Sequence, residues 1–335
     1  MGADRIAAAI DTLAQIASLC VMPTASKVDQ TAVRAEVLRD FRRHSGSILG
    51  GAFGAAAFDE VALVPVAAAV DRTGRFERNF ADRGVRSGFS AFLAIWGDSA
   101  DREAEGRRLQ TMHRDVRGHG KDHFADVRYS ALNPQLWNWI AISGIFVVLH
   151  SFTPATGITM NAAEQEAAYG QLLEAFRSIE LPGASAKLPE TYAEATRYYD
   201  DMVENQLQGN EFLSRVTAGL TRLPLPTLLL PGPVRLALSP SWLVVRPVAG
   251  RMLKVCSFGI MHPGVRKLTG FQWQSRHDRE FAVYTRLLQL AWRTLPDRLL
   301  LVPLAYNRLQ YEKLVRLHRS VALDSFAPLG CPAAG

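Results

Sequence analysis

The sequence predicts an all-α protein with one large multi-helix domain, and three observations support this fold class. Apolar residues recur at spacings of three and four along most of the chain, which is the pattern of amphipathic helices. Alternating apolar and polar runs joined by hairpin turns are scarce. The 335 residues are 48% hydrophobic and 21% charged, which is ordinary for a soluble globular protein. A chain of this length can also bury a large core.

Six helices are expected in the first half of the chain. The third is rich in alanine and glycine, so we assign the string Gly50-Gly51-Ala52-Phe53-Gly54 to close helix packing. Gly97 ends the fourth helix, and Asp98 or Ser99 can cap the fifth. Pro134 suits the first turn of the sixth helix, which follows a loop over 118–128. The expected ranges are 4–20, 30–43, 48–70, 79–96, 99–116 and 134–150.

The second half is also expected to be helical, with one interruption. Six prolines crowd the segment 224–247, so we predict that it is not one long helix. Because this segment is also apolar, packing across the domain suits it better than a free linker does. We assign residues 1–46 to N-terminal helices, 47–320 to the main domain and 321–335 to a tail. The expected helices are 161–179, 190–208, 252–258, 262–267, 276–293 and 296–318.

Several function classes lack support in the sequence. Cys20, Cys256 and Cys331 cannot form a disulfide framework, and they lack zinc-site and haem-attachment spacings. The chain has no Walker A loop, no dinucleotide-binding glycine motif, no G-x-S-x-G elbow and no H-E-x-x-H. No secretory signal is convincing, and the apolar run 136–149 is shorter than a membrane span. We therefore expect a reduced, cytoplasmic protein.

The charge is distributed unevenly. The net charge is +6, but residues 221–335 hold 16 Lys/Arg against 5 Asp/Glu, a net charge of +11. A solvated basic surface explains this most simply. The arginines stand singly without interleaved aromatic residues, so no nucleic-acid partner is expected. A hypothesis that stays open is peripheral contact with an anionic membrane through the Pro-rich apolar segment.

Candidate site residues lie on the two helices around Gly97. In an antiparallel helix pair, Ser87 and His113 would stand near one level, and Arg83 shares a face with Ser87. Bundle-type folds build cofactor pockets between helices in this way. The alternative to a cofactor ligand is that His113 is an exposed histidine on a charged helix. His150, at the end of an expected helix, suits a helix-capping role, and Cys256 suits an inert core thiol.

Ordered motifs extend this pattern over most of the chain. They are Asp82-Arg83-Gly84-Val85-Arg86-Ser87, Gly97, Met112-His113-Arg114-Asp115-Val116-Arg117-Gly118 and Tyr129-Ser130-Ala131-Leu132-Asn133-Pro134. In order and spacing, the sequence from about Ser47 to Leu309 resembles the ER-bound oxygenase mpaB / rubber oxygenase (latex clearing protein) catalytic domain family. The resemblance implies an all-α fold that holds non-covalent haem b. It also implies O2 chemistry on a lipophilic, isoprenoid- or lipid-like substrate.

The resemblance also implies roles for individual residues. His113 would be the iron ligand, Arg83 would support the haem pocket, and Ser87 would replace the family's threonine. Arg86 stands where rubber oxygenases can place a distal lysine, and it could hydrogen-bond bound oxygen or pair with a propionate. Trp139 is expected to contribute to the cofactor pocket. The catalytic candidates are thus Arg83, Arg86 and Ser87, and the cofactor candidates are His113, Arg83 and Trp139.

The sequence departs from the family pattern at positions that bear on catalysis. Val64 precedes Pro65 where members often carry histidine, and Ala141 stands at another position that is often histidine. Asn133 replaces the acidic residue before Pro134. An alternative is therefore a non-catalytic homologue that binds haem or lipid.

Overall fold

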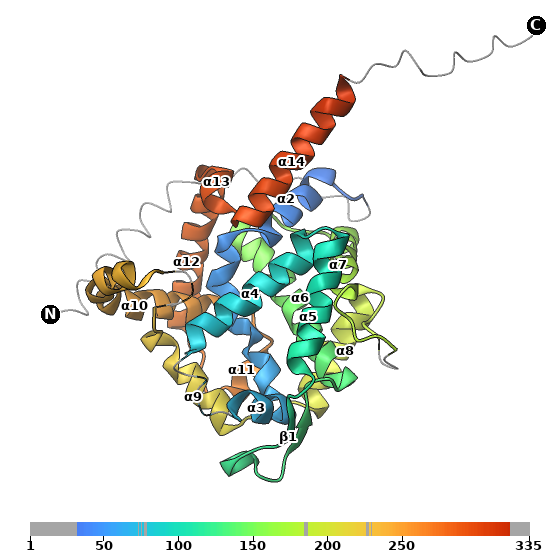
Figure 1. Cartoon of the computed structure of the whole chain (residues 1–335). Helices are drawn as coiled ribbons and strands as arrows, with labels where there is room; N and C mark the ends of the chain where they lie inside the picture. The colour runs from blue at the N-terminus through green and yellow to red at the C-terminus, as the bar shows by residue number, and fades with distance from the viewer. Residues whose placement is uncertain are drawn as a thin grey trace, which may run out of the picture.

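The computed structural model describes residues 32–321 except 73, 75, 77, 78, 184–186, 226, 227 and 229. These residues form helices and one small two-stranded sheet, which confirms the predicted all-α class (Figure 1). The expected helix 4–20 lies outside the described residues. In the first half, the elements are α2 (Ala35–Ser45), the 3-10 helix η1 (Ile48–Ala62), α3 (Val64–Asp71), α4 (Phe80–Trp96), α5 (Ser99–His113), β1 (Arg117–His119), η3 (Asp122–Phe124) and β2 (Arg128–Ser130).

The second half contains the longer helices. They are α6 (Pro134–Thr156), α7 (Ala162–Arg177), α8 (Tyr192–Asn205), α9 (Glu211–Gly219), η4 (Leu220–Arg222), α10 (Gly232–Ile260), α11 (Pro263–Leu268), α12 (Ser275–Thr294), α13 (Asp297–Leu300) and α14 (Pro303–Ser320).

Helix α6 runs through the centre of the core. Its sequence is apolar on all sides, as expected for a helix that is surrounded by other elements. It packs against η1, α7 and α12. Asn133 caps its first turn, and Gly157 ends it with a left-handed φ of 78°. Its fully buried side chains include Trp139, Ile142, Ile145 and Phe152.

The alanine-rich segment that precedes α4 is helical, as predicted, but its glycines do not make close helix contacts. A side chain added at Gly50, Gly51 or Gly54 would meet nothing within 4 Å. The small residues that pack are alanines, among them the fully buried Ala62 and Ala67. The segment also bends by 108° between η1 and α3. The assignment of the glycine string to close packing was therefore wrong.

The proline-rich segment 224–247 is not one helix, as predicted, but it is more helical than expected: the helix expected at 252–258 begins at Gly232. Residues 232–260 form one helix although Pro240 and Pro247 lie inside it. The two prolines are seven residues apart, so they fall on the same side, and both are exposed. Water can therefore bond the carbonyl groups that lose their helical N–H partners. An exposed helix therefore tolerates internal prolines that would leave carbonyl groups without partners in a buried helix.

Other boundaries differ from the expected ones. The segment expected as a loop contains the antiparallel pair β1–β2, in which Gly118 pairs with Tyr129. Helix α6 continues past His150 to Thr156, so His150 lies inside the helix and does not cap it. Helix α9 was not predicted, and the expected helix 296–318 is divided at Leu301 and Val302.

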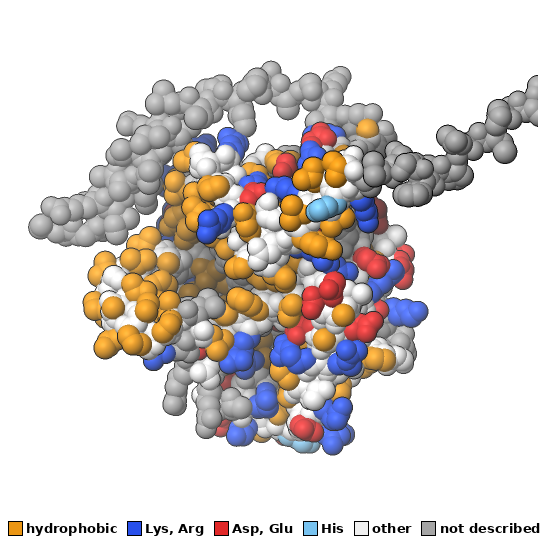
Figure 2. Space-filling view, turned by 45° about the horizontal axis from the view of Figure 1, so that its top comes forward, with side chains coloured by type: hydrophobic (Ala, Val, Ile, Leu, Met, Phe, Trp, Pro, Cys, Tyr) orange, Lys and Arg blue, Asp and Glu red, His pale blue; other side chains and the backbone are white. Residues whose placement is uncertain are grey.

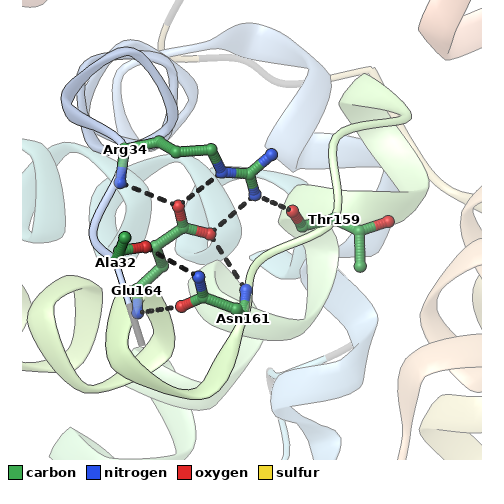
Figure 3. Close-up of polar contacts among 5 residues, drawn as sticks. All are labelled: Ala32, Arg34, Thr159, Asn161 and Glu164. Atoms are coloured by element: carbon green, nitrogen blue, oxygen red, sulfur yellow. Dashed lines mark hydrogen bonds and ion pairs between the residues drawn. The ribbon is translucent and has the colours of Figure 1, made fainter. Parts of the chain in front are cut away.

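An ion pair between half-buried Arg34 and buried Glu164 joins the start of α2 to the start of α7 (Figure 3). The Glu164 carboxylate is fully buried and accepts hydrogen bonds from Arg34 Nε at 2.7 Å, from Arg34 Nη2 at 2.8 Å and from the Arg34 backbone N–H at 3.0 Å. It also accepts the backbone N–H of Asn161, whose side chain accepts the Glu164 backbone N–H in return. The Arg34 side chain is the main reason that the pKa of Glu164 falls to about 2.

Among the described residues, α6 is the single helix that is long and apolar enough to cross a membrane. The bent pair η1–α3 would pass the same test only as one broken span. Of the most apolar stretch of α6, 61% is buried inside the protein, which is the behaviour of a core helix.

Candidate functional site

Helices α4 and α5 form an antiparallel pair that opens away from its turn. Asp98 and Asp101 close a reciprocal capping box at the start of α5, as the Gly97-Asp98-Ser99 break predicted. Near the turn, Ser90 of α4 donates to the buried carboxylate of Glu105, which also accepts Arg108 Nε at 2.6 Å. Farther from the turn, the two helices diverge (Figure 1). The Ser90–Glu105 hydrogen bond therefore joins the two helices near the turn.

We call the diverging part the α4–α5 wedge and define it by Arg83, Arg86, Ser87, Met112 and His113. Arg83 and Met112 each lie seven residues beyond the Ser90–Glu105 contact, which is about 10 Å along either helix. Arg83 and Met112 are therefore equally far from the turn. Ser87 and Arg108 are also equally far from it, because each lies three residues beyond the same contact. By the same count, His113, which follows Met112, lies nearer the level of Arg83 than that of Ser87.

His113 is held in a specific tautomer. Its Nδ1 lies 2.7 Å from the carbonyl oxygen of Leu109. A carbonyl can only accept, so Nδ1 carries the proton. The half-buried ring also packs edge-on against Trp137 of α6, with ring centroids 5.5 Å apart. In the neutral imidazole, Nε2 keeps its lone pair, and no hydrogen bond occupies it within the described residues.

The α4 side of the wedge presents cationic and hydroxyl groups to solvent. Arg83, Arg86 and Ser87 are exposed, and none of them forms an ion pair within the described part of the chain. The Arg83 guanidinium lies over the Phe76 ring at 5.1 Å from its centroid. Although Arg83 reaches solvent, surrounding protein lowers its pKa, and the nearby charge of Arg72 contributes to the shift.

Trp139 lies elsewhere in the molecule. It follows Trp137 by two residues, so the two side chains leave α6 on nearly opposite sides. Trp139 is fully buried, with its ring 5.1 Å from that of Tyr199 on α8. The contacts of α6 thus bring Trp137 to His113 and direct Trp139 into the core.

The wedge residues fit the requirements of a haem. A histidine ring nitrogen is one of the common protein ligands of haem iron, and the contact of His113 Nδ1 with the Leu109 carbonyl leaves Nε2 for that role. Haem propionates need cationic partners, and Arg83 and Arg86 have no carboxylate partner in the described ranges. The apolar macrocycle needs apolar surface, and Met112 and nearby Phe89 are 52% and 53% exposed. Among the described residues, no group of three or more metal-ligating side chains exists, and a haem needs none.

The two positions that are often histidine in the family add no ligand here. Val64 begins α3, and Ala141 is buried within α6.

A second polar cluster, which the sequence analysis missed, lies sealed in the core. Asp59 of η1 is 2% exposed and accepts Ser143 Oγ and Tyr199 Oη, each at 2.5 Å. Burial raises the pKa of Asp59 to about 6, and the two hydroxyl donors oppose that rise. The void beside it measures about 10 Å³, too small for a substrate. The signal in the sequence was the pair Asp59-Glu60 inside an apolar, alanine-rich stretch.

A larger cavity than the void beside Asp59 lies at the start of α6. It measures about 380 Å³ and is bounded by α3, β2, α6 and α8. Its lining mixes apolar and aromatic side chains with Arg128 and Asp201. Leu136, which lines it, is the neighbour of the Trp137 that contacts His113.

Comparison with known proteins gives one result for the family and none for individual relatives. Neither the curated proteins nor the solved structures contain a match to the chain. The family model for the ER-bound oxygenase mpaB/B′/rubber oxygenase catalytic domain matches residues 39–290, which is about three quarters of the chain. This range includes both arms of the wedge, η1, α6 and most of α12, and it confirms the resemblance found in the sequence. The chain belongs to the mpaB/rubber oxygenase catalytic domain family.

Proposed function

We propose that this protein is a haem-b-dependent oxygenase that acts with O2 on a lipophilic, isoprenoid- or lipid-like substrate. Membership of an oxygenase family supports the reaction class. The observation that carries the haem assignment is the bond from His113 Nδ1 to the Leu109 carbonyl, which leaves the Nε2 lone pair for a metal.

Each wedge residue then has a defined task. His113 would bind the iron through Nε2, and Trp137 would limit rotation of the imidazole ring. Arg83 and Arg86 would hold the propionate carboxylates or other anionic oxygens, since both guanidinium groups stay protonated. The Ser87 hydroxyl, one turn from Arg83, would donate a hydrogen bond within the same site. When bound, haem supplies the one-electron and O2 chemistry that side chains lack.

A lipophilic substrate agrees with the surface around the wedge. Met112 and Phe89 expose more than half of their surface although they lie beside the candidate site. Apolar side chains at a site rimmed by arginines favour an elongated apolar molecule over a sugar or a nucleotide. In this proposal, Trp139 of α6 packs in the protein core and does not contact the cofactor.

A second candidate function is a homologue that binds haem or lipid without turnover. Val64 and Ala141 favour it, because neither side chain can move a proton or bind a metal. In that case the wedge would keep its ligand-binding residues but lack further reactive groups.

The experiment loads purified protein with haem and measures O2 consumption together with oxidised products of an isoprenoid oligomer. We expect substrate-dependent O2 consumption that is lost in His113→Ala and kept in His119→Ala, a matched control at an exposed histidine on β1. Haem-loaded protein that consumes no O2 with any lipophilic substrate would favour the non-catalytic function.

A further inference from the structure

The first half of α10 carries the most concentrated exposed apolar surface of the described residues. Every residue from 231 to 248 is exposed or half-exposed, so no side of this half-helix is covered. Leu236 and Val244 each expose 77% of their surface. Figure 2 shows hydrophobic side chains gathered over this projecting part of the molecule. The large exposed apolar residues are Val234, Leu236, Leu238, Leu243, Val244, Val245 and Val248.

The second half of the same helix anchors it. Gly250 lies so close to the Leu220 carbonyl that any side chain there would collide with it. Val255, Cys256 and Phe258 are fully buried, and Arg251 forms a two-point ion pair with Glu280 of α12. The projecting half is therefore continuous with a helix segment that is packed into the protein. Isolated exposed leucines are ordinary, but a contiguous apolar helix surface indicates a partner.

The charges in the stretch of sequence that contains this surface are of one sign. From Glu211 to Asp278 the intervening sequence contains no aspartate or glutamate. It contains nine basic residues: Arg215, Arg222, Arg235, Arg246, Arg251, Lys254, Arg266, Lys267 and Arg276. Arg235 and Arg246 lie on the projecting half itself. An anionic partner would complement them, whereas a second copy of this chain would bring like charges together.

The prolines limit how deeply α10 could enter a lipid bilayer. Pro240 and Pro247 leave the carbonyl groups of Leu236 and Leu243 without helical N–H partners. These carbonyls need water, which the hydrocarbon centre of a bilayer does not provide. Helix α10 also fails the length-and-hydropathy test for a membrane span that α6 passes. The helix is thus suited to lie along an interface and unsuited to cross one.

Trp242 adds an interfacial feature. Its indole Nε1 donates to the Leu223 carbonyl at 2.9 Å, and the ring is half-exposed between Ser241 and Leu243. Tryptophan with a satisfied N–H and a partly open ring is typical of membrane–water interfaces.

We propose that the projecting half of α10, residues 232–248, docks this protein on anionic membrane surfaces, with its leucines and valines among the acyl chains and its arginines at the headgroups. Apolar burial supplies the attachment, and Arg235 and Arg246 select anionic lipid. This docking is independent of haem, since no residue of the α4–α5 wedge belongs to it.

The test is co-sedimentation of the full chain with vesicles of phosphatidylcholine alone and of phosphatidylcholine mixed with phosphatidylglycerol. We expect binding to the mixed vesicles that weakens as salt rises, and little binding to neutral vesicles. Leu236→Ser combined with Val244→Ser should weaken binding at least about tenfold, because two apolar side chains are lost from the interface. Leu314→Ser combined with Leu317→Ser, at exposed leucines of α14, is the matched control and should bind as the unchanged protein does.

Two results would overturn the proposal. One is equal binding, or no binding, of the unchanged protein and the Leu236/Val244 variant to phosphatidylglycerol vesicles at low salt. The other is a dimer in sedimentation velocity that this variant converts to monomer, because the surface would then bind a second copy. Each assay is run with and without haem, so a failure of docking remains separate from a failure of the proposed oxygenase function.

Discussion

The α4–α5 wedge and the sealed cluster around Asp59 differ in whether their polar side chains have partners within the protein. In the cluster, the Asp59 carboxylate is 2% exposed and both neighbouring hydroxyls donate to it. In the wedge, Arg83, Arg86 and Ser87 face solvent without an acidic partner in the described ranges, and His113 keeps Nε2 free. Polar groups that satisfy one another stabilise the fold, whereas unpaired groups at an accessible place remain available for a ligand.

This difference predicts which substitutions affect stability and which affect ligand binding. Changes in the cluster should lower the free energy of unfolding and leave haem affinity unchanged. Changes in the wedge should lower haem affinity and leave the free energy of unfolding unchanged. A residue that moved both quantities together would weaken the separation of the two regions.

The largest effect is expected at Trp139, which is fully buried beside the cluster. Trp139→Ala should lower the free energy of unfolding by about 4 kcal/mol, because it empties a large volume in the core. Trp139→Phe keeps most of this packing and should cost much less. Denaturant unfolding measures both variants. A loss of haem from stably folded Trp139→Phe would instead place this residue in the cofactor site.

The next effect is a pH dependence that comes from Asp59. Its pKa rises from 3.8 to about 6 on folding, so the native state binds more protons than the unfolded state across that interval. The contribution of Asp59 to stability is therefore full below pH 3.8 and is lost as pH rises to about 6, a change of roughly 3 kcal/mol. Asp59→Asn should remove this component.

The comparison of Asp59→Asn with the unchanged protein isolates this component from an opposing one. Burial lowers the pKa of His44 from 6.5 to about 4, so its contribution to stability rises with pH over an overlapping interval. The difference between the two unfolding curves cancels the His44 contribution. A pH-independent difference would contradict the role of Asp59.

A smaller effect is expected at Arg83, and it should appear in haem affinity rather than in stability. Arg83→Ala removes an unpaired cation from the wedge and should weaken haem binding about tenfold, or about 1.4 kcal/mol. Haem titration followed by absorbance measures this. Arg114→Ala, at an exposed arginine beside His113, is the control and should bind haem as the unchanged protein does.

The smallest effect is expected at Ser87. Ser87→Thr restores the residue type of the family motif at an exposed position, so stability should change by less than about 0.5 kcal/mol. Haem affinity should stay equal or increase slightly, because the hydroxyl is kept. A marked loss of affinity would mean that the wedge has no room for the extra methyl group when the cofactor is bound.

Local sequence patterns predicted helices and turns but not the buried polar cluster around Asp59. Pro134, the capping residue Asp98 and the helix-ending Gly97 indicated the start of α6 and the α4–α5 turn, because these signals act within a few residues. The Asp59 cluster joins residues 84 and 140 positions apart, and no local pattern records such a contact.

The errors also have physical causes. The extent of α10 was underestimated because both internal prolines lie in its exposed half, where water can bond the carbonyl groups that lose their N–H partners. The spacing of Arg83, Ser87 and His113 located two arms of a candidate site. It could not show that the helices diverge, since the divergence depends on what packs behind them.

The ultraviolet–visible spectrum of the purified protein, beside those of His113→Ala and His119→Ala, tests the haem assignment most directly. The account predicts a Soret band with one haem per chain in the unchanged protein and in His119→Ala. It predicts loss or a shift of that band in His113→Ala, with unchanged helix content by circular dichroism. A chain that shows no Soret band after reconstitution with haem, or an identical band in His113→Ala, would contradict it.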